Sequence, residues 1–305
     1  MTSTILNFGS INIDNVYRLE HFVQPGETLA SLSLDIVLGG KGANQSVAIA
    51  RAGVKVKHIG RACKTDSWVF AQLESCGVDI SHVEGVDEPS GHAIIQVDQQ
   101  GENAIVLHGG ANQSFDANDL AKLISKSHAG DYLLAQNECN GLSDMVEMAL
   151  DAGLKVALNP APMTAAIRSL PLHRLDTLIV NQGEAQALCD QIEIDDVVSA
   201  LAESLPQTRV VITLGGDGAI LIVGGSVTKV PAFATKVVDT TAAGDTFVGY
   251  FLAGLVGGLS DLQALERASE AASLAVQSLG AIPSIPKLEQ LNFTNVTLPA
   301  SVLPT

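Results

Sequence analysis

The chain has few basic residues, few cysteines and no long hydrophobic run. Its 305 residues include 33 acidic and 17 basic side chains, which give a formal net charge of −16. We therefore expect no broad basic surface for nucleic acid or for an anionic membrane. No stretch reaches the roughly 18 apolar residues of a membrane-spanning helix, and the first residues lack a basic export signal. Neither nucleic acid nor a membrane is an expected partner.

The cysteines offer no sign of a disulfide framework or a zinc site. Cys63, Cys76, Cys139 and Cys189 lie far apart, without a Cys-x-x-Cys pair or a Cys/His spacing typical of zinc ligands. We expect free thiols and a cytoplasmic protein.

Several chemical motifs are also missing. No Gly-x-Ser-x-Gly elbow occurs, which excludes the commonest α/β hydrolase interpretation. The first predicted strand is followed by "GSINID" and not by Gly-x-Gly-x-x-Gly, which argues against a dinucleotide-dependent oxidoreductase. The histidines form no His-Glu-x-x-His pair. The segment "GGKGAN" (residues 39–44) is not a Walker A loop, because Gly42 follows Lys41 where Ser or Thr is required.

Short β-rich segments alternate with helical segments that end at glycine, a pattern typical of parallel strands joined by crossover helices. Residues 28–38 and 92–107 instead alternate like antiparallel strands. No Pro/Gly/Ser-rich linker and no internal repeat divides the chain. We predict one α/β domain over residues 1–305, with a doubly wound, mostly parallel central sheet flanked by helices. A small accessory β-sheet lid is expected from segments at about 11–38 and 90–109.

Polar residues follow the predicted strands and open the predicted helices. Because ligands of an open α/β sheet bind beyond the carboxyl ends of its strands, these residues are expected along one rim. They are Asn12, Asp14, residues 39–44, Glu138, Asn159, Asn181, Glu184, Gly215 and Gly216. For "GGKGAN" two interpretations stay open, a flexible turn or a close approach of a ligand to the backbone, with Asn44 bonding a hydroxyl.

The segment "DTTAAGDTF" (residues 239–247) stands before a long apolar helical run. If Ala242, Ala243 and Gly244 form the first helical turn, their N–H groups point outward beside the positive end of the helix dipole. Small side chains would let a phosphoryl group reach these N–H groups. Asp245 on the same turn can then accept a proton from an attacking hydroxyl. The simpler alternative is a helix cap beside tightly packed small residues.

The order of these motifs identifies a family. "DTTAAGDTF" resembles the second signature of the ribokinase family of carbohydrate kinases, and "GGKGAN" resembles the first. "GSINID", "PGET", "GENAIVLHGGAN", "ALNPAP" and "TLGGDGA" also match, so the resemblance runs in order from Gly9 to about Pro286. It implies the ribokinase-like fold and phosphoryl transfer from ATP to a sugar hydroxyl, with the 5-hydroxyl of D-ribose as the expected acceptor.

The resemblance also implies roles for individual residues. Asp245 is the expected general base, and the expected anion hole is formed by Ala242, Ala243 and Gly244. The expected sugar ligands are Asn12, Asp14, Gly40, Lys41, Asn44, Glu138 and Asp245. The expected nucleotide-side residues are Asn181 and Glu184, which organise Mg²⁺, and Thr213, Gly215 and Gly244 along the ATP phosphates. The expected K⁺ ligands are Asp239, Thr241, Ala275, Ser278, Gly280 and Ser284.

Three alternatives stay open at this point. In the first two, the acceptor of the phosphoryl group is another small sugar, such as deoxyribose or a fructose-type sugar, or a nucleoside. In a different class, the chain is a non-catalytic sensor of sugar or nucleotide; Asp245 argues against this, because a sensor needs no base beside the phosphate. For its assembly, we expect a homodimer formed through the lid sheet.

Overall fold

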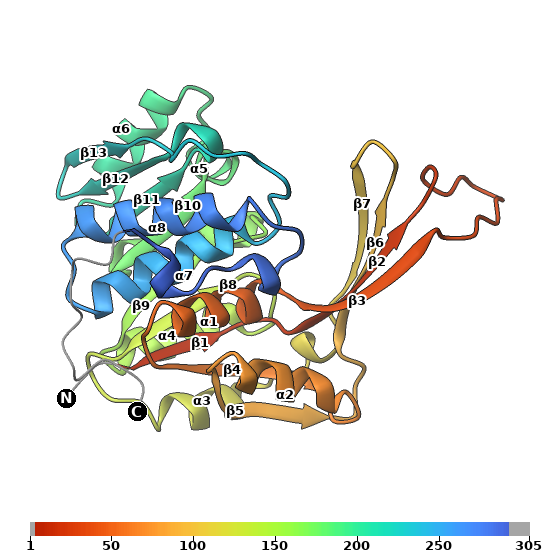
Figure 1. The fold of residues 1–305 in the computed structure, drawn as a ribbon. Coiled ribbons are helices and arrows are strands. Elements are labelled where there is room, and N and C mark those ends of the chain that lie inside the picture. The colour runs from red at the N-terminus through yellow and green to blue at the C-terminus, as the bar shows by residue number, and fades with distance from the viewer. Residues whose placement is uncertain (1–3, 293–305) are drawn as a thin grey trace.

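A nine-stranded sheet runs through the centre of the molecule (Figure 1). The structure, a computed structural model, describes residues 4–292; residues 1–3 and 293–305 of the expected single domain lie outside this range. From β5 to β11 the neighbouring strands pair in parallel, and the β12–β13 hairpin adds an antiparallel edge. In spatial order the strands are β13 (Ser226–Val230), β12 (Ala219–Val223), β11 (Arg209–Thr213), β10 (Thr177–Asn181), β9 (Lys155–Asn159), β8 (Tyr132–Gln136), β1 (Ile5–Phe8), β4 (Val56–Cys63) and β5 (Asp79–Val86).

Helices cover both faces of this sheet. Alternation along β1 shows why: Ile5 packs with the helices of one face, whereas Leu6 and Phe8 pack with those of the other. The first face carries α1 (Lys41–Arg51), α2 (Ser67–Ser75), α7 (Ala243–Val256) and α8 (Asp261–Ala275). The second face carries α3 (Ala117–Ile124), α4 (Leu142–Asp151), α5 (Gln182–Cys189) and α6 (Ile194–Ser204). The predicted doubly wound α/β class is confirmed.

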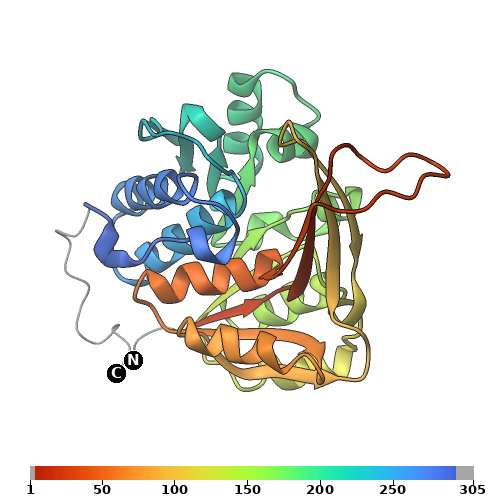
Figure 2. The same ribbon diagram turned by 45° about the vertical axis from the view of Figure 1, so that its right-hand side comes forward.

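A separate four-stranded sheet projects from the main body beside the start of α1 (Figures 1 and 2). Its strands, in order, are β3 (Ser33–Gly39), β2 (Asn12–Arg18), β6 (Gly91–Val97) and β7 (Asn103–His108). We call it the lid sheet.

No helix of residues 4–292 is long and apolar enough to cross a bilayer.

Some expected element boundaries are wrong. Asn12 and Asp14 lie within strand β2 and not in a loop after the first strand. Helix α1 begins at Lys41, before the start at Asn44 that the apolar run up to Ala52 predicts, because Gly40 takes a φ of +92° and turns the chain from β3 directly into the helix. The apolar pattern of residues 262–279 predicts a helix over that whole range, but α8 ends at Ala275.

Candidate active site

Helix α7 starts with an unusual backbone turn. Ala242 caps it in the left-handed region, with a φ of +59°, which is uncommon for a residue with a side chain. The Thr246 N–H donates to the Ala242 carbonyl at 2.8 Å, and the Ala243 N–H donates to the Thr240 carbonyl at 3.2 Å. Within residues 4–292 the N–H groups of Ala242 and Gly244 have no hydrogen-bond partner. These two groups can therefore receive an anion at the positive end of the helix.

Asp245 is the third residue of α7, and its carboxylate faces helix α1. Asn44 Nδ2 donates to Oδ2 and Gln45 Nε2 donates to Oδ1, each at 2.9 Å. Burial raises the pKa of Asp245 to about 6; Lys41 and the two amide donors oppose this rise, and Glu138 adds to it. A carboxylate with this pKa is mostly ionised at neutral pH and is more basic than an ordinary aspartate, as a general base requires.

Lys41 and Glu138 form an ion pair beside Asp245. Glu138 Oε2 accepts hydrogen bonds from the Ser10 hydroxyl and from the Lys41 N–H, the latter at 3.0 Å. Lys41 Nζ lies 3.5 Å from Glu138 Oε1. Burial works to lower the pKa of Lys41, but Glu138 and Asp245 raise it above its ordinary value. The lysine thus carries a positive charge next to the proposed base.

Asp14 reaches the same region from the lid sheet. A Cβ on Gly39 would overlap the Asp14 carboxylate, so only glycine leaves room for it there. Burial raises the pKa of Asp14 to about 6, Glu138 raises it further and Lys41 opposes the rise; no hydrogen bond contributes. A half-buried carboxylate without a donor is suited to accept hydrogen bonds from the hydroxyl groups of a ligand.

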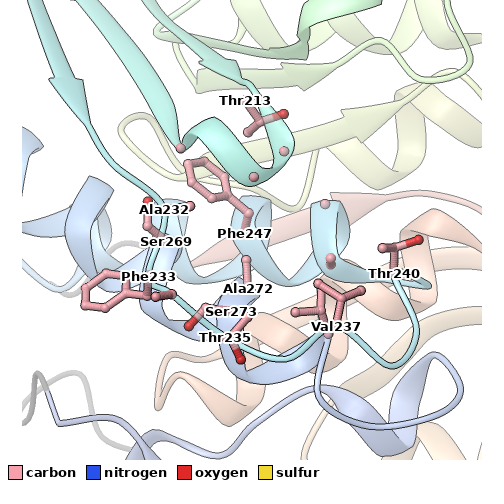
Figure 3. Close-up of a pocket in the computed structure, with 17 residues that line it drawn as sticks. Thr213, Ala232, Phe233, Thr235, Val237, Thr240, Phe247, Ser269, Ala272 and Ser273 are labelled. Atoms are coloured by element: carbon pink, nitrogen blue, oxygen red, sulfur yellow. The ribbon is translucent and has the colours of Figure 1, made fainter.

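Two adjoining cavities lie at the start of α7. The larger, of about 530 Å³, lies between the turn after β11, the segment before α7 and helix α8 (Figure 3). The smaller, of about 220 Å³, is lined by Asp245, Lys41 and residues at the start of α5. Thr213 and Gly244 line both cavities, so the two spaces meet at the start of α7.

Among the described residues 4–292, those that line the larger cavity include no charged side chain. Phe233, Val237 and Phe247 contribute apolar surface, and the turn after β11 contributes glycines, including Gly215. Its polar side chains are the hydroxyls of Thr213, Thr235, Thr240, Ser269 and Ser273. Ser269 Oγ is buried and has no hydrogen-bond partner within residues 4–292. A flat, largely apolar group with a few polar edges fits such a wall.

Asn181 and Glu184 form a capping box at the start of α5. The Glu184 N–H donates to Asn181 Oδ1 and the Asn181 N–H donates to Glu184 Oε2, each at 2.9 Å. Both residues line the smaller cavity, with Glu184 Oε1 outside this pair of bonds. No cluster of three or more His, Cys, Asp or Glu that could hold a metal occurs within residues 4–292. The donors fit Mg²⁺, which is commonly held by one or two carboxylates, waters and substrate phosphates.

Asp239 joins the segment before α7 to the segment after α8. Its Oδ1 accepts hydrogen bonds from the Thr241 N–H at 2.9 Å and the Thr241 hydroxyl at 2.6 Å. Its Oδ2 accepts from the Gly280 N–H at 2.8 Å. Burial opposes ionisation of this carboxyl, but the bonds to Thr241 and Gly280 lower its pKa below the ordinary value. Three of the expected K⁺ ligands therefore lie together around one carboxylate.

The other three expected K⁺ ligands belong to the C-terminal side of this arrangement. Ala275 is the last residue of α8, and its carbonyl accepts from the Ser278 N–H at 3.3 Å. The Ser284 hydroxyl donates to the Ala281 carbonyl at 2.8 Å. Carbonyl, hydroxyl and carboxylate oxygens are the donors that hard cations prefer, so the residues present fit such an ion.

Some polar residues of the site were not among the predicted ones. Gln45 holds Asp245, and Ser10 holds Glu138. Asn112 donates to Asn12 Oδ1 at 2.8 Å, and thereby ties the first residue of β2 to the segment after β7. Each of these contacts spans at least 100 positions, so no local sequence signal could have found it.

Sequence comparison places this geometry in a known group. Residues 2–288 match the family described as pfkB family carbohydrate kinase. A ribokinase of Haemophilus influenzae is 38% identical over 271 residues, which cover 84% of this chain and 86% of that protein. A deoxyribokinase of Salmonella typhimurium is 31% identical over 258 residues, which cover 80% of this chain and 82% of that protein.

Solved structures agree. A ribokinase from Cryptococcus neoformans in complex with ADP is 37% identical, with a TM-score of 0.80 over 94% of this chain and 98% of that one. The Arabidopsis thaliana ribokinase complexed with ribose and ATP is 29% identical, with a TM-score of 0.86 over 97% of this chain and 100% of that one. On this evidence the chain belongs to the pfkB family of carbohydrate kinases.

Proposed function

We propose that this protein transfers the γ-phosphoryl group of ATP to the 5-hydroxyl of D-ribose, giving ADP and D-ribose 5-phosphate. One observation carries the proposal: the Asp245 carboxylate lines the smaller cavity together with Lys41, which pairs with Glu138, and this cavity meets the larger one at the start of α7. The relatives named ribokinase support the choice of sugar, and the relatives complexed with ADP or with ribose and ATP support both ligands.

In this mechanism the sugar lies between the lid sheet and the start of α1. Its hydroxyls bond to Asp14, Asn44 and the Lys41–Glu138 pair, with Asn12 and Gly40 at the same edge. Asp245 takes the proton of the 5-hydroxyl as that oxygen attacks the γ-phosphorus, and the bond from phosphorus to the ADP oxygen breaks. Positioning and charge stabilisation supply most of the rate in such transfers.

The start of α7 stabilises the transferring group. The N–H groups of Ala242 and Gly244 face the developing negative charge, with Ala243 in the same turn; losing one donor of this kind costs on the order of 3 kcal/mol. Asn181 and Glu184 would hold Mg²⁺ beside the phosphates, and Thr213 and Gly215 would line the phosphate path. Mg²⁺, when bound, supplies charge neutralisation on the phosphates.

K⁺ is proposed between the two segments that Asp239 joins. The same hydrogen bonds already connect these segments to the residues before Ala242. An ion there would stiffen the turn that carries the anion hole.

The dependence on ATP, together with four free cysteines, favours a cytoplasmic site of action.

A second acceptor has specific support. The similarity to a deoxyribokinase makes 2-deoxy-D-ribose the leading alternative to D-ribose. The two sugars differ by one hydroxyl group, so a residue that bonds ring hydroxyls decides between them.

The test is an ADP-release assay with the purified protein over a panel of pentoses, hexoses and nucleosides, with the phosphorylated product identified by mass spectrometry and NMR. We expect D-ribose to give the highest kcat/KM and the phosphate to lie on O5. A higher kcat/KM for another sugar or a nucleoside would replace the acceptor. Absence of ADP release with every compound, while sugar and nucleotide still bind, would favour a sensor.

For its assembly we propose a homodimer formed through the lid sheet. Ile36 of β3 and Ile94 of β6 both stand opposite Asn15 of β2, and Val106 of β7 stands opposite Ile94. Residues that stand opposite one another in neighbouring strands point to the same side, so Ile36, Ile94 and Val106 share one face of the lid sheet. Their side chains are 56%, 42% and 65% exposed. A row of exposed aliphatic residues on a sheet of this kind is suited to association with a second copy.

A further inference from the structure

A buried row of amide side chains lies behind Asp245. Asn7, Gln136 and Asn159 stand at or near the carboxyl ends of three neighbouring strands, β1, β8 and β9. Their alternating neighbours Ile5, Leu134 and Ala157 pack with the helices of the α1 face, so the three amides point to α1 as well. Gln45 faces them from α1 and is fully buried.

A main-chain carbonyl fixes the orientation of this row at its first end. Asn7 Nδ2 donates to the Gly42 carbonyl at 2.8 Å, and a carbonyl oxygen can only accept. Asn7 Oδ1 is thereby turned to Gln136, whose Nε2 donates to it at 2.9 Å. The same Gln136 nitrogen donates to Gln45 Oε1 at 2.7 Å. The oxygen of Gln45 must therefore face Gln136.

A second carbonyl fixes the row at its other end. Asn159 Nδ2 donates to the Ile179 carbonyl at 2.9 Å, so Asn159 Oδ1 is left as an acceptor. Gln45 Nε2 donates to that oxygen and to Asp245 Oδ1, each at 2.9 Å. Two independent anchors thus lead to one result, that the nitrogen of Gln45 faces Asp245 and cannot exchange places with its oxygen.

We infer that Gln45 is a positioning residue, which holds the Asp245 carboxylate in the orientation and protonation state that proton abstraction requires. This inference rests on the proposed function, because it needs Asp245 to act as the base. Gln45 donates both of its N–H bonds within the protein, its oxygen accepts from Gln136, and the side chain is fully buried, so it is not placed to bind the sugar. Asn44 differs, because its buried Oδ1 has no hydrogen-bond partner among residues 4–292.

The pKa of Asp245 depends on the groups around it, so removal of the Gln45 donor should change the pH dependence of kcat. Burial raises the pKa of Asp245, and Glu138 after β8 adds to the rise; Lys41, Asn44 and Gln45, all on α1, oppose it. Glu184 at the start of α5 lines the same cavity. Without the donor from Gln45 the base becomes harder to ionise. The acid limb of the kcat profile should then move to higher pH.

The experiment compares Gln45→Met, which keeps the length of the side chain and lacks the donor, with the wild type under the ribose kinase assay. At pH 7 we expect kcat to fall about tenfold, because hydrogen bonds to charged groups are among the strongest in proteins. The acid limb should move up by about one pH unit, while KM for the sugar changes by less than about twofold. Added to Asp245→Asn, the substitution should lower kcat no further.

Ser46→Ala is the matched control. Ser46 is the next residue of α1 and is equally buried; its hydroxyl bonds to Asn7 of the row and to His58, and it makes no hydrogen bond to Asp245 within residues 4–292. We expect Ser46→Ala to lower the melting temperature and to leave the acid limb in place. If Gln45→Met behaves in the same way, Gln45 only holds α1 to the sheet and the inference is overturned.

Two further measurements keep the outcomes separate. If circular dichroism shows that Gln45→Met does not fold, Gln45→Glu replaces it. A second carboxyl group beside Asp245 should move the acid limb of the kcat profile to higher pH by at least as much as expected for Gln45→Met. An acid limb that stays in place overturns the inference. Near-normal kcat in Asp245→Asn alone would remove the base itself, and with it the proposed function. A large loss in Asp245→Asn with no effect at Gln45 would remove only the role of Gln45.

Discussion

Asn44 Nδ2 donates a hydrogen bond of 2.9 Å to Asp245 Oδ2 across 201 positions of sequence. The two residues belong to the first turns of α1 and α7, which pack together on one face of the sheet. A Cβ on Gly249 would overlap Ala48, so a glycine permits the close approach of the two helices. The amide of Asn44, a proposed sugar ligand, is therefore held in contact with the proposed base.

Replacement of the base tests the centre of the mechanism. Asp245→Asn should keep the fold and nucleotide binding and lower kcat by roughly 10²-fold or more, because general-base help is typically worth ~10²–10⁴. Steady-state kinetics and nucleotide titration with the purified variant provide the measurement. Turnover close to that of the wild type would exclude Asp245 as the base.

Asp14 should read the ring hydroxyls of the sugar. It projects from strand β2 of the lid sheet. Leaving its carboxylate without a partner costs about 1–3 kcal/mol, which corresponds to roughly 5- to 150-fold in specificity. We expect the wild type to have a higher kcat/KM for D-ribose than for 2-deoxy-D-ribose. Asp14→Ala should lower kcat/KM for D-ribose and bring the values for the two sugars closer together. An equal loss for both sugars would mean that Asp14 only holds the strand.

The raised pKa of Asp14 also predicts a stability effect. In the folded protein this pKa is about 6, against 3.8 for an ordinary aspartate, so the folded state binds more protons between these values. The free energy of unfolding should therefore fall as the pH rises through this window. Asp14→Asn, which stays neutral, should melt higher than the wild type at pH 7.5 and lose this advantage near pH 4. Melting curves at both pH values check this, and an advantage that persists unchanged at pH 4 would contradict it.

The proposed K⁺ site predicts activation by a monovalent cation. Exchange of a large organic cation for K⁺ at constant ionic strength should raise kcat, because an ion beside Asp239 would order the segment that leads to Ala242. Asp239→Ala should abolish this response, whereas the exposed carboxylate of Asp195 on α6 provides a control in Asp195→Ala. An equal rate in both cations would remove the ion from the mechanism.

The lid sheet predicts a self-association that can be disrupted. Ile94→Lys together with Val106→Lys should convert a dimer into a monomer, because charged residues are costly in an apolar interface. Light scattering coupled to size exclusion measures the mass. The matched control is Val227→Lys, which alters an exposed apolar residue on the β13 edge of the main sheet. A wild type that is already a monomer at micromolar concentration would contradict the proposed dimer.

Local sequence determined a large part of this protein. The alternation of β-rich and helical segments indicated the doubly wound sheet, since period-2 and helical patterns record which side of each element is buried. The small residues before Asp245 indicated a helix start with open N–H groups. At Gly40, however, a φ of +92°, which glycine permits, turns the chain from β3 into α1, and this helix start was not predicted.

Only the tertiary structure decided how the site is assembled. Asn44 and Gln45 are successive helical residues, about 100° apart around α1, and sequence spacing would send them in different directions. Their different lengths let both reach Asp245 once α7 packs beside α1. Likewise the orientation of Gln45 depends on Asn7, Gln136 and Asn159, which come from three strands. Such contacts follow from the packing of distant elements, and no local pattern of residues records them.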